Sequence, residues 1–167
     1  MGVLSDRLDS MRVRVPSPDG MITGELRNRM EVRLSFASGS YRQYDIPTLE
    51  RQLVGLARRL WAGRTRKFYE ALSEAFGETV TGESRPVSPR DVAFHAARDE
   101  LVVQGRSADG RVRVATRGMQ RWRVKITDGT LRTLSEEEFS VRVSEAAAAL
   151  IREQLEKVRE LKQQFYD

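Results

Sequence analysis

Apolar and polar residues alternate with period two along short segments of this chain and recur with a helical period along two long ones. The alternation predicts half-buried β-strands, and the 3.6-residue period predicts amphipathic helices. The predicted strands cover residues 11–15, 21–26, 31–36, 101–104, 111–116 and 121–126. A long helix is predicted after each set of three strands, over residues 49–76 and from a cap at residue 135 to about residue 166.

The two sets of elements are copies of one motif that repeats at a spacing of 90 residues. The repeated identities include Asp19/Asp109, Gly20/Gly110, Arg27/Arg117, Arg33/Arg123, Gly39/Gly129, Leu60/Leu150 and Lys67/Lys157. A repeat of fixed period sets the architecture, and two copies are too few for a solenoid. We therefore predict an α+β protein in which two fused copies form an intramolecular pseudo-dimer. We expect the chain to be monomeric.

The first copy is expected to span residues 1–77 and the second residues 88–167. Residues 78–87, rich in Gly, Thr, Ser and Pro, are the predicted linker. Each copy begins with a short predicted helix. The second of these helices starts at Ser88-Pro89, because Ser caps a helix N-terminus and Pro suits the first helical position.

Two features mark the long helices. Ser135, followed three residues later by Glu138, has the pattern of a capping box. Gly55 and Gly63 lie inside the first long helix, where they predict either the close approach of another helix or a slight bend. The apolar stripe of both helices shifts after the fourth turn. We expect each helix to pack first on the sheet and then on a partner beyond it.

The composition argues against an enzyme. The 167-residue chain has no Cys and a single His, His95, so neither a thiolate or His-based metal site nor a Ser-His-Asp triad is supported. The phosphate-binding pattern G-x-x-x-x-G-K-[ST] does not occur. We expect no catalytic residue, no metal site and no cofactor.

Hydropathy and charge predict a location and a class of partner. No apolar run approaches the roughly 18 residues that span a bilayer, and the N-terminal segment has no signal-peptide core. We therefore expect a cytoplasmic protein without a membrane partner. The net charge of +5 and the pI near 10 favour a polyanion as partner.

The second copy resembles the YbaB/EbfC family of small nucleoid-associated DNA-binding proteins. The residues that carry this resemblance are 103–114, Gly118, 124–126, 134–138 and the Ala-rich run 146–149. The match covers residues 88–167, and residues 11–76 fit the same pattern more loosely. The resemblance implies a helix, a three-stranded sheet and a long helix in each copy, with paired long helices projecting as a tweezer. This chain departs from the family by carrying both subunits in one polypeptide and by shortening the first helix.

Cations of the second copy are predicted to line one face of its sheet, because side chains two apart on a strand share a face. These residues are Arg111, Arg113, Arg121, Arg123 and Lys125, to which the first copy adds Arg12 and Arg14. The remaining strands of the first copy carry the nearly neutral set Thr23, Glu25, Glu31, Arg33 and Ser35. A row of Arg side chains neutralises phosphates without reading sequence. The alternative is a charged face that only keeps the sheet soluble.

The long helices hold further candidates. The exposed cations of the first long helix are a second candidate site for nucleic acid: Arg51, Arg58, Arg59 and Arg66. In the second long helix Glu outnumbers the cations, and the spacing predicts the pairs Glu138–Arg142 and Glu153–Lys157. That helix is expected to serve structure or a protein partner.

Trp61 and Trp122 have the chemistry of stacking platforms for bases, but their apolar neighbours favour packing in the core. From the basic sheet face and the resemblance we expect a non-enzymatic protein of the nucleoid that binds duplex DNA largely without regard to sequence. The alternative is a protein-interaction scaffold, or a chaperone-like accessory of a type VII secretion system, that binds a partner through its long helices. Accessory proteins of type VII secretion systems also look like relatives of this fold.

Overall fold

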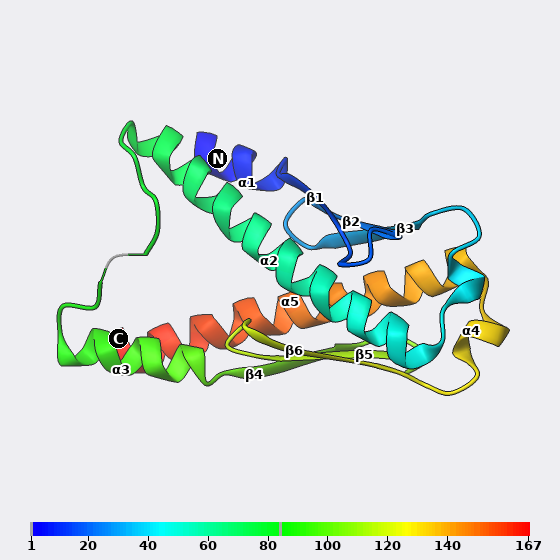
Figure 1. Cartoon of the computed structure of the whole chain (residues 1–167). Helices are drawn as coiled ribbons and strands as arrows, with labels where there is room; N and C mark the ends of the chain where they lie inside the picture. Colours follow the sequence, from blue (N-terminus) through cyan, green and yellow to red (C-terminus); the bar gives the residue numbers. More distant parts are fainter. Residues whose placement is uncertain (1, 84) are drawn as a thin grey trace.

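The computed structural model describes residues 2–83 and 85–167 and contains the motif twice (Figure 1). The first copy consists of α1 (Val3–Asp9), β1 (Arg12–Pro16), β2 (Ile22–Arg27), β3 (Glu31–Phe36), a 3-10 turn η1 (Tyr41–Gln43) and α2 (Ile46–Phe76). The second consists of α3 (Pro89–Asp99), β4 (Val102–Arg106), β5 (Val112–Arg117), β6 (Arg121–Ile126), a short helix α4 (Thr130–Thr133) and α5 (Glu136–Tyr166). The described residues between α2 and α3 form no helix or strand.

The strands form two separate antiparallel sheets, in the orders β1-β2-β3 and β4-β5-β6. The predicted bounds of β3 and β6 are confirmed, and those of the other strands differ by one or two residues. The prediction for the start of α2 was wrong by three residues. Asp45 caps the helix by accepting a hydrogen bond from the Thr48 backbone N–H at 2.8 Å, which places Pro47 inside the first turn. The caps at Ser88 and Ser135 are confirmed.

The turn between the first two strands of each sheet is built in the same way in both copies. The Ser17 hydroxyl donates to Asp19 at 2.6 Å and accepts from the Ile22 backbone N–H at 3.0 Å. Ninety residues later, the Ser107 hydroxyl bonds Asp109 and the Val112 backbone at 2.7 and 3.1 Å. Both Ser side chains are buried. A buried hydroxyl needs hydrogen-bond partners, so these matched pairs explain why the turn is repeated.

The two long helices run between the two sheets (Figure 1). Helix α2 packs on β1 and β2 of its own sheet and on β6 of the other, while α5 packs on β4 and β5 and on β3. Hydrogen bonds join the copies at these crossings and between the segments that precede α2 and α5. The Ile126 backbone N–H donates to Glu50 at 2.8 Å, the Ser144 hydroxyl donates to the Val32 carbonyl, and the Tyr41 hydroxyl donates to the Leu134 carbonyl at 2.9 Å. The predicted intramolecular pseudo-dimer is therefore confirmed.

The copies share one hydrophobic core. Its main cluster combines Leu49, Leu53 and Leu56 of α2 with Phe139 and Val143 of α5, and with apolar residues of both sheets. A second cluster likewise joins residues of β1, β2, β3 and α2 to a residue of α5. Since neither copy has a core of its own, burial of apolar surface holds the copies together.

The two glycines inside α2 allow a sheet, and not another helix, to approach closely. A Cβ atom at Gly55 would collide with the Pro18 ring, and one at Gly63 would collide with a methyl group of Val13. Pro18 lies in the turn after β1, and Val13 lies in β1 itself. Of the two alternatives, the close approach of another helix was wrong, because α2 closely approaches strand β1 and the turn after it in its own copy.

The far half of each long helix packs on the short helix of its own copy. Helix α2 contacts α1, and α5 contacts α3. Phe94 of α3 meets Phe165 with ring centroids 6.1 Å apart, and the Tyr166 hydroxyl donates to Asp91 at 2.6 Å. The partner expected beyond the sheet is thus the short helix of the same copy. Among the described residues, no helix is both long enough and apolar enough to cross a membrane.

One of the two ion pairs predicted on α5 is present. Lys157 Nζ lies 2.9 Å from Glu153. The prediction of a Glu138–Arg142 pair was wrong, because Glu138 is held in the capping box and accepts from the Ser135 backbone N–H at 2.9 Å. Arg142 instead reaches across to the turn of its own sheet.

Candidate nucleic-acid interface

Six cations cover the outer face of the sheet β4-β5-β6. Strand pairing aligns Arg106, Arg113 and Lys125 in one row and Arg117 with Arg121 in another, and Arg123 lies between these rows on β6. All six side chains are exposed. We call this set, Arg106, Arg113, Arg117, Arg121, Arg123 and Lys125, the basic face.

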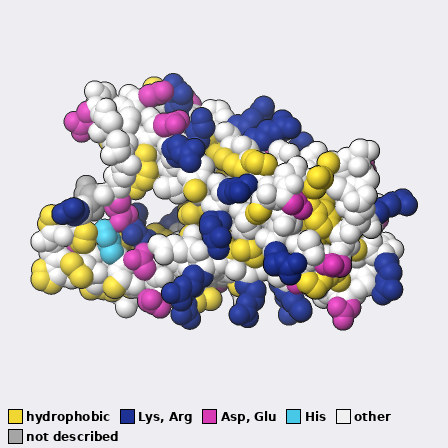
Figure 2. Space-filling view, viewed as in Figure 1, with side chains coloured by type: hydrophobic (Ala, Val, Ile, Leu, Met, Phe, Trp, Pro, Cys, Tyr) yellow, Lys and Arg dark blue, Asp and Glu magenta, His cyan; other side chains and the backbone are white. Residues whose placement is uncertain are grey.

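The inner face of the same sheet fixes the direction of these cations. Val112 and Val114 on β5, and Val124 and Ile126 on β6, are buried under the long helices. Because successive side chains on a strand point to opposite faces, the residues between them must point to solvent. Figure 2 shows Lys and Arg side chains gathered along the lower edge of the molecule, where this sheet lies, with others over α2.

The basic face carries almost no compensating acid. Within the described ranges, only Arg117 of the six has a carboxylate within 4.0 Å, that of Glu100 at 3.9 Å. The other five cations form no ion pair with a described residue. Like charges on neighbouring strands repel one another. A polyanion that neutralises these cations would relieve that repulsion.

Arg111 is set apart from the basic face. Its side chain is only 32% exposed, and its Nε lies 3.6 Å from Asp109. Asp109 also accepts from Arg142 at 2.8 Å. The hydrogen bond from the Arg111 backbone N–H is the main cause that lowers the pKa of Asp109 to about 2, and the bonds from Ser107 and Arg142 add to it. Arg111 therefore belongs to the turn at the start of β5.

Arg106 and Arg117 were missed by the sequence analysis. The signal was present, since Arg106 continues the alternation of Val103 and Gly105, and Arg117 follows the buried Thr116. The strands were predicted to end one or two residues too early, which left both cations outside them.

The first sheet presents a partly neutralised face on the opposite side of the helices. Arg12 and Arg14 of β1 are exposed, but Glu25 of β2 lies opposite Arg14 in the strand register. Glu25 forms an ion pair with Arg27 and lies 3.8 Å from Arg12. The hydrogen bond from Arg27 is the largest cause that lowers the pKa of Glu25. On β3, Arg33 pairs with Glu31 at 2.7 Å.

A comparison of positions 90 residues apart, which we call pseudo-equivalent, shows how the two faces diverged. Four cations of the basic face correspond to uncharged or acidic residues of the first sheet: Arg106 to Pro16, Arg113 to Thr23, Arg121 to Glu31 and Lys125 to Ser35. The backbone pairing at these positions is the same in both sheets. The fold itself therefore does not require cations there.

The candidate cations of α2 lie in different surroundings. Arg59 donates to the Pro16 carbonyl at 2.8 Å and so fastens the helix to β1. Arg66 lines a groove formed with the segment after α2. Arg51 lines a hollow between α2 and β6 together with Arg123 of the basic face. Arg58 follows Arg51 by two helical turns on the same side of the helix.

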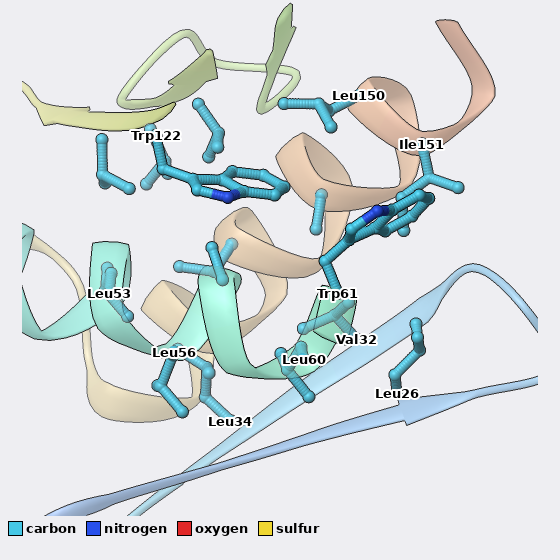
Figure 3. Close-up of a pocket in the computed structure, with 16 residues that line it drawn as sticks. Leu26, Val32, Leu34, Leu53, Leu56, Leu60, Trp61, Trp122, Leu150 and Ile151 are labelled. Atoms are coloured by element: carbon cyan, nitrogen blue, oxygen red, sulfur yellow. The ribbon is translucent and has the colours of Figure 1, made fainter. Parts of the chain in front are cut away.

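Trp61 and Trp122 line an apolar cavity of about 70 Å³ between the two copies. Figure 3 shows both indole rings turned toward this cavity, Trp122 from β6 and Trp61 from α2. The Trp122 N–H is buried and has no acceptor among the described residues. Both residues are partly buried and pack against the core. Both indoles therefore pack in the core on the inner side of the sheet, and Trp122 also reaches the surface hollow beside α2.

Comparison of the chain with protein-family models, with curated proteins and with solved structures gives no match.

Proposed function

We propose that this protein binds duplex DNA through the basic face, largely independently of sequence, as a nucleoid-associated protein similar to the YbaB/EbfC family in a tandem form. The observation that carries the proposal is the set of five exposed cations on one sheet face that lack an acidic partner among the described residues. The matching face of the first sheet is partly neutralised by Glu25 and Glu31.

The shape of the basic face favours contacts to phosphates. A helix or a two-stranded ribbon fits the major groove of DNA and reads base edges there. The basic face is a three-stranded sheet backed by helices, so its Arg and Lys side chains are the groups that reach the duplex. Arg and Lys on phosphates release counterions and position a protein without specifying sequence.

The other candidate cations fit this proposal to different degrees. Arg51 borders the basic face at Arg123, and Arg58, on the same side of α2, would extend that surface along the helix. Arg12 and Arg14 lie on the outer face of the other sheet, with both long helices between them and the basic face. They would therefore not contact the same stretch of DNA.

The test uses two variants that each remove two cations and install the residues of the other copy. Arg113→Thr with Lys125→Ser changes the basic face, and Arg12→Val with Arg14→Gln changes the first sheet. Affinity for a labelled blunt duplex is measured at several salt concentrations. We expect the first variant to bind more weakly and to reduce the slope of log K against log salt by about 1.8, because each phosphate contact contributes about 0.9. The second variant should match the wild type.

Two results would refute the proposal. One is an absence of binding by the wild-type protein at 50 mM salt. The other is an equal loss of affinity in both variants, which would show that net charge matters and the face does not. Circular dichroism of both variants controls for folding, and changes at exposed positions usually alter stability by less than about 0.5 kcal/mol.

A second candidate function is a protein-interaction scaffold or a secretion accessory. The observation that favours it is a set of exposed apolar side chains on the long helices: Phe76 at the end of α2 and Val141 and Leu155 on α5. Exposed apolar surface of this kind suits a partner chain. The same titration discriminates between the candidates, because a scaffold would show no duplex binding at low salt.

A further inference from the structure

The hollow between α2 and β6 is built from both copies. Its volume is about 340 Å³. We call this hollow the notch. The residues that line it include Glu50, Arg51, Val54, Trp122 and Arg123. Arg51 and Val54 come from the first copy, and Trp122 and Arg123 come from the second. The packing of α2 on β6 across the pseudo-dimer brings the two Arg residues to one site.

The floor of the notch is apolar and partly aromatic. Trp122 lines both the notch and the internal cavity, so its side chain forms the wall between them. The Trp122 N–H is buried, so the part of this side chain that solvent reaches is carbon. Val54 adds further apolar surface at the helix side.

The hydrogen bonds within the notch do not use all the N–H donors of its two Arg side chains. Glu50 accepts the Ile126 backbone N–H at 2.8 Å, which holds its carboxylate at the edge of β6. Arg51 donates one N–H to the Thr48 hydroxyl at 3.2 Å. Arg123 has no hydrogen bond or ion pair with a described side chain. A guanidinium carries five donors, so both Arg side chains retain the capacity to bind an anion in two-pronged fashion.

The pseudo-equivalent place between α5 and β3 lacks these features. Arg51 corresponds to Val141 and Trp122 to Val32, while Arg33, which corresponds to Arg123, is paired with Glu31. The combination of two unneutralised Arg residues and an aromatic floor therefore occurs once in the described pseudo-dimer. Arg51 comes from the first copy, and Arg123 and Trp122 come from the second, so neither copy alone contains the whole site.

We propose that the notch receives an unpaired nucleotide of DNA that is bound on the basic face. The phosphate would lie between Arg51 and Arg123, and the base would pack on the exposed carbon surface of Trp122. This inference rests on the proposed DNA binding and adds a preference for DNA with single-stranded ends. A base inside a duplex is stacked on its neighbours, so only an unpaired or extruded base reaches such a site. Aromatic contact accepts any base, because every base has a π-face.

The test starts from a Trp61→Phe variant, in which Trp122 is the only Trp of the chain. Its Trp fluorescence and its affinity are measured with a blunt duplex and with a duplex that carries a thymidine 3′ overhang, at equal numbers of phosphates and equal salt. We expect the overhang to quench Trp122 and to bind at least about fivefold more tightly, the lower limit for one base on an aromatic side chain. The blunt duplex should bind without quenching.

Three further variants locate the effect. Arg51→Val installs the pseudo-equivalent residue and should abolish both the preference and the quenching, while weakening blunt-duplex binding no more than Arg58→Val does. Arg58→Val removes an exposed cation from the same side of α2 outside the notch, and it should keep the preference. Trp122→Phe, which retains an aromatic ring, should keep the preference in the wild-type background.

Each outcome separates the two proposals. Salt-dependent binding of blunt duplex with no preference for the overhang would overturn the notch and leave the proposed function intact. A preference that survives Arg51→Val would also overturn the notch. Thymidine monophosphate provides the last arm of the test. If it binds more tightly than the overhang, the notch is a site for free nucleotides and the proposal fails.

Discussion

Three substitutions in the first sheet can build a second basic face on this protein. Each installs the residue that the second copy carries at the pseudo-equivalent position. Thr23→Arg, Glu31→Arg and Ser35→Lys place the residues of the basic face at the pseudo-equivalent positions of the first sheet. The outer face of the first sheet carries Arg12, Arg14, Arg27 and Arg33 against Glu25 and Glu31, a net charge of +2. The three changes raise this charge to +6, equal to that of the six cations of the basic face.

The two faces point in opposite directions, because the long helices lie between the sheets. If the basic face binds DNA, the altered protein should hold two duplexes at once, and the wild-type protein should hold one. Six phosphate contacts give a slope of log K against log salt of roughly −5. A rise from 50 to 200 mM salt should therefore weaken the second duplex by about a thousandfold.

The assay immobilises one duplex on beads, adds protein, and then measures retention of a second, labelled duplex. A control variant with Thr23→Ser, Glu31→Gln and Ser35→Thr alters the same positions without adding a cation. We expect retention only with the arginine and lysine variant, and loss of retention at 200 mM salt. Strong retention by the wild-type protein, or none by a folded variant that still binds one duplex, would show that sheet charge does not decide how many duplexes are bound. Sedimentation of each protein excludes a contribution from dimers.

Two further predictions concern stability. Gly105→Ala should lower the free energy of unfolding by roughly 1–3 kcal/mol, because its Cβ would lie 2.5 Å from the Leu150 backbone nitrogen and collide with the Ala146 carbonyl; urea denaturation should show this loss, whereas Gly82→Ala, with open space around it, should be neutral. The pKa of Asp109 falls from 3.8 to about 2 in the folded state, so its stabilising contribution is complete above about pH 4 and is lost as the pH falls toward 2. Asp109→Asn should flatten that part of a stability-against-pH curve, and an unchanged curve would contradict the assigned hydrogen bonds.

Local patterns in the sequence were sufficient to predict the six strands, the two short first helices, the two long helices and the direction of most side chains, but not the 3-10 turn η1 or the short helix α4. The two-residue alternation at Arg113, Arg121 and Arg123 places cations opposite buried valines, because strand geometry leaves no other choice. The caps at Ser88 and Ser135 were equally predictable, since a cap depends on residues within one turn. The repeat predicted the pseudo-dimer, because each copy alone would expose an equivalent apolar surface, and pairing of the copies buries both surfaces.

Contacts between elements were decided only by the tertiary structure. The sequence contains no signal that Arg51 meets Arg123, because that meeting depends on how α2 crosses β6 of the other copy. Gly55 and Gly63 indicated a close approach, but the approaching groups, Pro18 and Val13, follow from the packing of α2 on its own sheet. Periodicity describes which face of an element is apolar, and it does not determine which neighbour covers that face.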